Sequence, residues 1–143
     1  MATQIKVRGY HIDVFQHVNN ARYLEFYESD RWACMDEHNF LGWALKSQLA
    51  MVAVNINVNY FHGAILGDEL TVTTRIEKIG TKSALCYQQI TRERQGKREV
   101  VSDAKVTFVF IDLALNKSIK IEGELREKLE LLSKSSTEDF IAA

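Results

Sequence analysis

Hydrophobic and polar residues alternate along several stretches of the chain, with the period of two that is typical of half-buried strands. Residues 3–8 follow this period and stop at Gly9, which predicts a short first strand. Residues 68–78, 83–94 and 98–112 are rich in β-branched and aromatic residues and predict three more strands, joined by short turns that favour antiparallel neighbours. The clearest alternation predicts a strand over residues 52–60, with one face formed by Val52, Val54, Ile56, Val58 and Tyr60.

The pattern becomes helical between the first two strands and again near the end of the chain. Asn19 or Asn20 is the expected N-cap of a helix that runs to about His38. Apolar residues cover much of its circumference, so we expect other elements to surround it. A short apolar segment follows at residues 39–49. Residues 122–132 predict a C-terminal helix whose apolar side is formed by Leu125, Leu129 and Leu132.

This element order predicts an α+β fold in which one long helix lies across an antiparallel sheet. Nothing marks a linker, so we expect one domain over residues 1–132 and a flexible C-terminal tail over residues 133–143. At 1.5 Å per residue, a helix of about 18 residues is about 27 Å long and covers one sheet face only in part. A symmetric dimer that joins the sheets edge to edge would protect the exposed edges.

Charge and cysteine content exclude several classes of function. The 18 Lys and Arg residues and 19 Asp and Glu residues give a net charge of -1, which argues against a general attraction to nucleic acid or to an anionic membrane. There is no apolar run long enough to cross a bilayer and no signal-peptide pattern, so the cytoplasm is the expected location. Cys34 and Cys86 are too few and too far apart for a zinc site, so we expect reduced thiols and no metal.

The stretch from Arg8 to Phe26 is the richest in candidate chemistry. Backbone N–H groups in the first turn of a helix lack partners within the helix and carry partial positive charge, so this end suits a developing negative charge. Simpler roles are equally consistent with the residues alone: helix caps for the asparagines, an exposed loop carboxylate for the aspartate, and structural hydrogen bonds for the histidines. The polar residues in question are His11, Asp13, His17, Asn19 and Asn20.

The hotdog-fold thioesterases of the 4-hydroxybenzoyl-CoA thioesterase family have a signature that resembles HIDVFQHVNNARYLEFYE: an Asp, three variable residues and His-Val-Asn lead into the central helix. Their second block resembles VNINVNYFHGAILGDELTVTTRIEKIGTKS. The resemblance covers about residues 3–132, and the whole chain is most similar to the bacterial long-chain acyl-CoA thioesterase branch, which is associated with fatty-acid oxidation. It implies a long helix wrapped by a strongly curved, five-stranded antiparallel sheet. Many relatives carry Arg-Pro after the Tyr of the second block, where this chain has Phe61-His62-Gly63.

The same resemblance implies a hydrolase that cleaves long-chain fatty acyl-CoA to a free fatty acid and coenzyme A, without a cofactor. Asp13 takes the position of the catalytic carboxylate, which either activates water or attacks the carbonyl itself. Asn20 takes the position whose backbone amide holds the oxyanion. His17 takes a supporting position that orients the loop, Asp13 or water. Coenzyme A thiolate is a good leaving group, so the implied reaction needs neither a metal nor a strong general acid.

Substrate contacts are expected from two regions. Tyr23 and Tyr27 lie on an aromatic helix face that would line a slot for the acyl chain, although ordinary core packing accounts for most residues of such a face. Lys82 and Ser83 are candidates for binding the coenzyme A phosphates, as are Arg92 and other basic residues around the turn at residues 95–96, where plain solubility is the alternative.

The sequence alone leaves other functions and assemblies open. The fold would also suit a thioesterase for short or aromatic acyl-CoA or for acyl chains on acyl carrier protein, or a non-catalytic protein that binds acyl-CoA. The intact Asp13 in an intact signature argues against the non-catalytic reading. We expect a homodimer or homotetramer, with acyl-CoA as substrate and without a nucleic acid or membrane partner.

Overall fold

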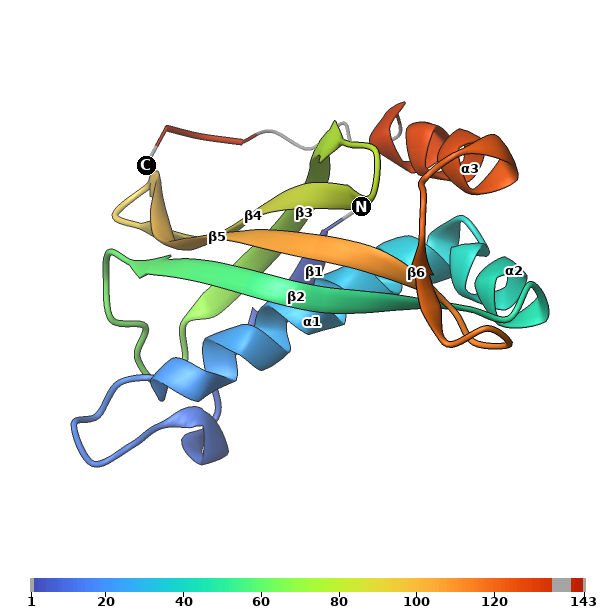
Figure 1. The fold of residues 1–143 in the computed structure, drawn as a ribbon. Helices are drawn as coiled ribbons and strands as arrows, with labels where there is room; N and C mark the ends of the chain where they lie inside the picture. Colours follow the sequence, from blue (N-terminus) through green and yellow to red (C-terminus); the bar gives the residue numbers. More distant parts are fainter. Residues whose placement is uncertain (1, 135–139, 143) are drawn as a thin grey trace.

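A curled antiparallel sheet wraps one long helix in the computed structural model, which describes residues 2–134 and 140–142 (Figure 1). The strand order is β1, β3, β4, β5, β2, and the short β6 also pairs with β5. This confirms the predicted α+β architecture. The elements in chain order are β1 (Thr3–Lys6), the 3-10 helix η1 (Gly9–His11), α1 (Asn20–Glu37), α2 (Phe40–Lys46), β2 (Leu49–Tyr60), β3 (Glu69–Ile79), β4 (Ser83–Arg94), β5 (Lys97–Asp112), β6 (Lys117–Ile119) and α3 (Gly123–Lys134).

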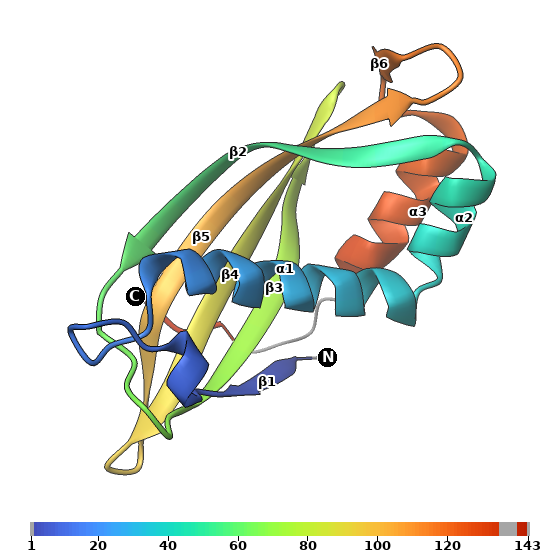
Figure 2. The same cartoon turned by 90° about the horizontal axis from the view of Figure 1, so that it is seen from below.

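Helix α1 lies across one face of β3, β4 and β5 (Figure 2). Its start is set by Asn19, whose side chain accepts a hydrogen bond from the Ala21 N–H at 2.9 Å. Leu24 and Trp32 are exposed, so the sheet surrounds the helix on part of its circumference only. The side of α1 that faces the sheet carries three buried aromatic residues, Tyr23, Phe26 and Tyr27.

A β-bulge changes which residues of β2 share a face. β2 pairs with β5, and the extra residue in β2 is Val54. Before the bulge Val52 lies opposite Val109, and after it Asn55 lies opposite Thr107. Residues opposite each other in a sheet lie on the same face, and Val109 and Thr107 are two residues apart, so Val52 shares its face with Asn55. The predicted continuous apolar face over residues 52–60 is therefore wrong at Val52, because an extra residue reverses the alternation.

The end of the molecule away from the start of α1 holds two features that the alternation did not predict (Figure 2). β6 pairs with the end of β5, so the sheet has six strands instead of the five expected. Its three residues are too few to show a period of two. The apolar segment after α1 forms helix α2, which packs with α3 on one end of the sheet. The core there contains Phe40, Ala44, Phe110, Ile121, Leu125 and Leu129.

The C-terminal region is partly ordered against the sheet. α3 continues to Lys134, two residues beyond the predicted domain boundary at residue 132. Further on, the Ile141 N–H donates to Gln89 Oε1 at 3.1 Å, and the Phe140 ring lies 5.6 Å from the Tyr87 ring. The predicted flexibility of residues 135–139 and 143 falls outside the described residues.

Leu129→Ala should lower the free energy of unfolding by about 2–5 kcal/mol, because Leu129 is buried in the core under α3 and its truncation leaves a cavity. Leu131→Ala is the matched control on the same helix: Leu131 is 62% exposed, and its truncation should change this free energy by less than about 0.5 kcal/mol. Chemical denaturation of both variants measures the difference. Equal losses would contradict the burial of Leu129 between α3 and the sheet.

Candidate active site

The segment between η1 and α1 forms a tight loop that is closed by its own backbone. Ile12 and Val18 pair as an isolated antiparallel bridge. Inside the loop, the Asp13 N–H donates to the His17 carbonyl and the Gln16 N–H donates to the Asp13 carbonyl, both at 3.0 Å. Gln16 completes the turn in the left-handed region, with φ of 66°. This loop holds Asp13 and His17 close together at the start of the long helix.

The Asp13 carboxylate is half-buried and is anchored at one oxygen. Its Oδ1 accepts a hydrogen bond from the Phe15 N–H at 2.9 Å. Within the described residues, its other oxygen has no hydrogen-bond donor and no ion-pair partner. A carboxylate held in this way can take a proton from water or attack an electrophile with the oxygen that is not engaged.

The first turn of α1 supplies an unpaired donor. Asn19 caps the helix, with its side chain on the Ala21 N–H and its carbonyl on the Arg22 N–H, both at 2.9 Å. The Asn20 N–H has no acceptor among the residues that the structure describes. This N–H carries the partial positive charge of a helix start. The capping role therefore belongs to Asn19, and the Asn20 amide is available to an oxygen atom of a ligand.

Asp13 and Asn20 open on one cleft of about 400 Å³ at the N-terminal end of α1. The structure brings four of the predicted site residues together in its wall, namely Asp13, His17, Asn20 and Tyr23. The lining residues that sequence reasoning missed are Phe15, Val18, Tyr60, Phe61, His62 and Gly63. The first two of these lie inside the recognised signature but carry no polar side chain. The other four come from the end of β2 and from the loop after it, residues 61–68. The one available signal there was the departure from Arg-Pro.

The His17 imidazole packs directly on the backbone of Gly63. A Cβ atom at position 63 would lie 2.5 Å from His17 Cδ2, closer than two carbon atoms approach without a shift. Next to this contact, the Val18 N–H donates to the Ala64 carbonyl at 2.9 Å. The loop that carries Asp13 and the loop after β2 are therefore joined side by side, and His17 lies between them.

Tyr23 and Tyr60 give the cleft an aromatic wall. Tyr23 is 1% exposed, and its hydroxyl accepts a hydrogen bond from the Ala64 N–H at 3.3 Å. The Tyr60 ring meets the Tyr23 ring edge to face at 5.1 Å, and the Tyr60 hydroxyl donates to the Asn20 carbonyl at 3.1 Å. Burial raises the pKa of both tyrosines above the ordinary value. Both hydroxyls are therefore neutral near neutral pH, and this wall suits an apolar part of a ligand.

Three predicted substrate-binding residues lie outside this cleft. Tyr27 is one helical turn beyond Tyr23 and is buried, with its hydroxyl 2.6 Å from the Ser102 hydroxyl. Its place is that of ordinary core packing, the alternative given by the sequence. Lys82 and Ser83 line a separate cleft of about 590 Å³ at the turn between β3 and β4. A role for these two residues in binding phosphate stays a prediction.

Arg92 also lies away from its expected place. The sequence placed it among exposed basic residues near a hairpin tip, but its side chain is only 4% exposed. It forms ion pairs with Asp68 and Glu99. Its charge is compensated inside the protein, so the expectation of a free basic group at this position is wrong.

The two cysteines line a smaller cavity of about 70 Å³ between α1, α3 and the sheet, which contains none of the predicted site residues. Neither cysteine is in a disulfide bond, and burial raises the pKa of Cys86 to about 12. This thiol is protonated near neutral pH and is a poor nucleophile. The described residues gather no group of three or more His, Cys, Asp or Glu side chains that could hold a metal ion. In the same part of the chain, no helix combines the length and the apolar character needed to span a membrane.

His11 is a neutral structural group that joins the two ends of the loop between η1 and α1. It is 7% exposed, its Nδ1 accepts the Arg8 N–H at 2.9 Å, and its ring meets the Phe26 ring edge to face. Its carbonyl accepts the Asn19 N–H at 2.9 Å. Burial, and then the positive charge of Arg22, lower the pKa of His11 below its ordinary value of 6.5. This is the structural role that the sequence left open for a histidine here.

Known proteins are similar to this chain over most of its length. Residues 7–129 match the family model described as the thioesterase-like superfamily. The chain is 52% identical over 134 residues to the long-chain acyl-CoA thioesterase FadM of Escherichia coli, covering 94% of this chain and 100% of that protein. It is 29% identical over 111 residues to the acyl-CoA thioesterase YbgC of Haemophilus influenzae, covering 76% of this chain and 79% of that protein. The crystal structure of YbaW, a probable thioesterase from Escherichia coli, superposes with a TM-score of 0.86 at 51% identity, covering 93% of this chain and 98% of that one.

Stability should fall as the pH is lowered through 6.5, in part because of His11. The unfolded chain binds a proton at His11 near pH 6.5, whereas the folded chain does so only at a lower pH, so protons favour unfolding in the interval between the two values. His11→Asn keeps an acceptor for the Arg8 N–H without a titrating ring, and its melting temperature should fall less between pH 7.5 and pH 5.5 than that of the wild type. Thermal unfolding at both pH values tests this. Parallel pH profiles for the two proteins would contradict it.

Proposed function

Because the chain belongs to the thioesterase-like superfamily, we propose that it hydrolyses the thioester of long-chain acyl-CoA, releasing a free fatty acid and coenzyme A. The fold is the hotdog fold that the signature predicted, a long helix wrapped by a curled antiparallel sheet. One observation carries the proposal: Asp13, whose carboxylate has one oxygen without a partner among the described residues, and Asn20, whose N–H has no acceptor among them, line the same cleft. A carboxylate and an oxyanion donor in one cleft are what cleavage of an acyl group requires.

The proposed reaction places the thioester carbonyl oxygen at the Asn20 N–H. Addition of an oxygen nucleophile to the carbonyl carbon moves negative charge onto that oxygen, where the amide and the dipole of α1 stabilise it. Asp13 either takes a proton from the attacking water or adds to the carbon itself, in which case water then cleaves the mixed anhydride. In both routes the C–S bond breaks and coenzyme A leaves as its thiolate.

The remaining cleft residues support binding in this proposal. The aromatic wall of Tyr23 and Tyr60 faces the acyl end of the substrate, because contact between uncharged aromatic rings and a hydrocarbon removes apolar surface from water at little cost in free energy. His17 acts through the loop, since its carbonyl fixes the Asp13 backbone and its ring packs on Gly63. The proposed place of action is the cytoplasm, where two cysteines without a disulfide bond stay reduced.

We further propose that the active form is a homodimer joined through β2, or a tetramer built from such dimers. β2 is the last strand in the order and pairs with β5 alone among the described strands, so its other edge is open. An open edge of this length is a template for another strand. Its exposed apolar side chains are Val52, Val54, Ile56 and Tyr60. Tyr60 also lines the cleft, so pairing through β2 would bring the second subunit next to the site.

Asp13→Asn should reduce palmitoyl-CoA hydrolysis by at least about a thousandfold, because the amide can neither take a proton from water nor attack the carbonyl. The Asn Oδ1 can still accept the Phe15 N–H, so the loop and the melting temperature should be preserved. Asp112→Asn is the matched control: Asp112 makes the same kind of turn, with Oδ1 on the Ala114 and Leu115 N–H groups, far from the cleft. Thiol release with a chromogenic reagent measures both variants.

A series of acyl-CoA substrates from acetyl to palmitoyl then defines the acyl length. Highest kcat/KM for the long chains supports the proposal, whereas a preference for short or aromatic acyl groups, or for acyl carrier protein, would replace the substrate and keep the chemistry. Tight binding of palmitoyl-CoA without thiol release would mean that the protein is a binder.

Val54→Lys should convert the dimer into a monomer. Val54 lies in the middle of β2, and a two-fold axis that joins β2 to its copy would bring the two lysine charges close together. Leu115→Lys is the matched control, since Leu115 is 66% exposed in the turn between β5 and β6. Sedimentation velocity gives the mass of each species. A wild type that sediments as a monomer would refute assembly through β2.

A further inference from the structure

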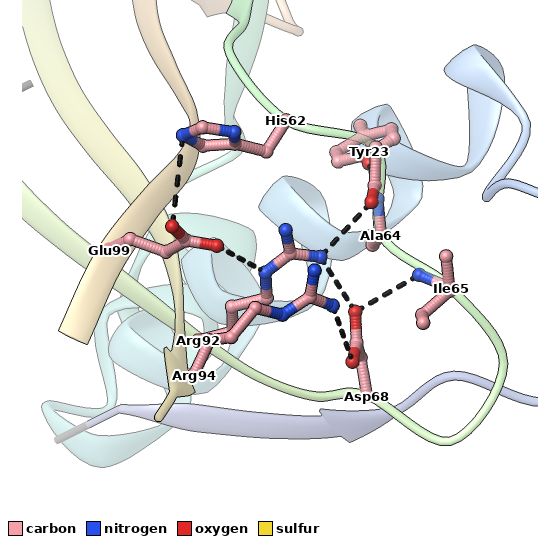
Figure 3. A network of polar contacts seen from close by, with 9 residues as sticks. Tyr23, His62, Ala64, Ile65, Asp68, Arg92, Arg94 and Glu99 are labelled. Atoms are coloured by element: carbon pink, nitrogen blue, oxygen red, sulfur yellow. Dashed lines mark hydrogen bonds and ion pairs between the residues drawn. The ribbon is translucent and has the colours of Figure 1, made fainter. Parts of the chain in front are cut away.

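Behind the cleft lies a buried arginine that holds the loop after β2 (Figure 3). Arg92 on β4 is 5% exposed and donates from Nε to Glu99 on β5 at 2.7 Å. Its Nη1 donates to Asp68 Oδ2 at 2.8 Å and to the Gly63 carbonyl at 3.0 Å. One guanidinium therefore connects two strands of the sheet with a residue in the wall of the cleft.

The partners of Arg92 extend this anchor over the whole loop. Asp68 Oδ2 also accepts the Ile65 N–H at 3.0 Å, so the same carboxylate fixes a second point of the loop. Arg94 lies 3.6 Å from the other oxygen of Asp68. Figure 3 shows Arg92 and Arg94 reaching the loop from β4 and Glu99 reaching it from β5. His62 lies next to Glu99, with Nε2 3.8 Å from its carboxylate.

The anchor acts on the catalytic side of the cleft through Gly63. The carbonyl of Gly63 is held by Arg92, and its Cα lies against the His17 ring with no room for a side chain. The His17 backbone carbonyl in turn accepts the Asp13 N–H, and the Val18 N–H donates to the Ala64 carbonyl. A shift of Gly63 therefore has to move the loop that carries Asp13.

A buried guanidinium suits this task. Two carboxylates compensate its charge, and the hydrogen bond from Arg92 lowers the pKa of Glu99 below its ordinary value. The planar group has several donors with fixed directions, so it can hold two side chains and a carbonyl at once, whereas the ammonium of a lysine is a point charge on a flexible stem. Loss of the guanidinium leaves two acidic groups and a carbonyl without their donor.

We propose that Arg92 is a positioning residue for the hydrolysis: through Gly63 it sets the place of the His17–Asp13 loop relative to the Asn20 N–H. This inference rests on the proposed function, because the reaction defines which placement matters. Arg92 does not line the cleft and reaches its wall only through the Gly63 carbonyl, so its effect is expected on the rate of the chemical step more than on substrate binding.

The test compares Arg92→Ala with a matched control, Arg126→Ala. Arg126 on α3 also holds backbone carbonyls, those of Ile79, Gly80 and Ile121, at 3.1–3.4 Å, but at the opposite end of the sheet. Both variants should lose stability, whereas kcat for palmitoyl-CoA should fall by at least about tenfold in Arg92→Ala only, with KM changed by less than about threefold. Rates are compared at a temperature where circular dichroism shows both variants to be folded. Arg92→Lys should recover only part of kcat.

A double-mutant cycle separates positioning from general weakening. Gly63→Ala pushes on the His17 ring directly and should lower kcat by itself. If Arg92 acts through Gly63, the loss in Arg92→Ala/Gly63→Ala is smaller than the product of the two single losses. Equal kcat for Arg92→Ala and wild type, or a cycle in which the losses multiply, would overturn the proposal.

An NMR measurement keeps this proposal distinct from the proposed function. Amide shifts of residues 13–20 should change in Arg92→Ala and stay in place in Arg126→Ala, whether or not any substrate is turned over. A wild type that releases no thiol from any acyl-CoA would refute the hydrolase, and with it the kinetic role of Arg92. If the wild type does release thiol but the amide shifts of residues 13–20 are the same in Arg92→Ala as in the wild type, the positioning role alone is refuted.

Discussion

The Asn19 cap sets the residue at which α1 begins, but the position of that end relative to the sheet depends on hydrogen bonds between the middle of the helix and the sheet. Asp30 is fully buried, and its carboxylate accepts hydrogen bonds from the hydroxyls of Thr3 and Thr74. The next residue, Arg31, donates to Gln88 Oε1 at 3.0 Å. Apolar contacts are not directional and tolerate sliding, whereas these hydrogen bonds are satisfied in one alignment of helix and sheet. That alignment places the Asn20 N–H, about 15 Å further along the helix axis, at the cleft.

Most of the fold was predictable because its signals are local. The helix over residues 20–37 starts at an asparagine cap and contains no breaker, and β4 follows an uninterrupted strand pattern between two turns. The bulge at Val54 was not predictable, because apolar and polar residues keep alternating through it and only the pairing with β5 reveals the extra residue. β6 was missed for a related reason: three residues show no period, and their strand character comes from the partner strand.

The same distinction separates the parts of the candidate site. Asp13, His17 and Asn20 lie within eight residues of each other, so one segment of sequence contains them all. Tyr60 and Gly63 join them only through the path of β2 across the sheet, which no local pattern gives. Spacing was also ambiguous within the helix: Tyr23 and Tyr27 share a face, but one turn along the axis separates the cleft from the core.

Charge placement around the cleft explains how an arginine can brace its wall without forming an ion pair with the carboxylate in it. A cation beside Asp13 would stabilise the ionised form and make that oxygen a weaker base. Arg92 instead directs its donors to Asp68, Glu99 and one backbone carbonyl, all behind the wall, and the contact that reaches the cleft side is the van der Waals packing of Gly63 on the His17 ring. Position is transmitted across that contact while charge is not. Gly63 without Arg92 would leave the loop unsupported, whereas an arginine without its own acidic partners would pair with the Asp13 carboxylate. The glycine contact and the fully paired arginine behind it are therefore both required.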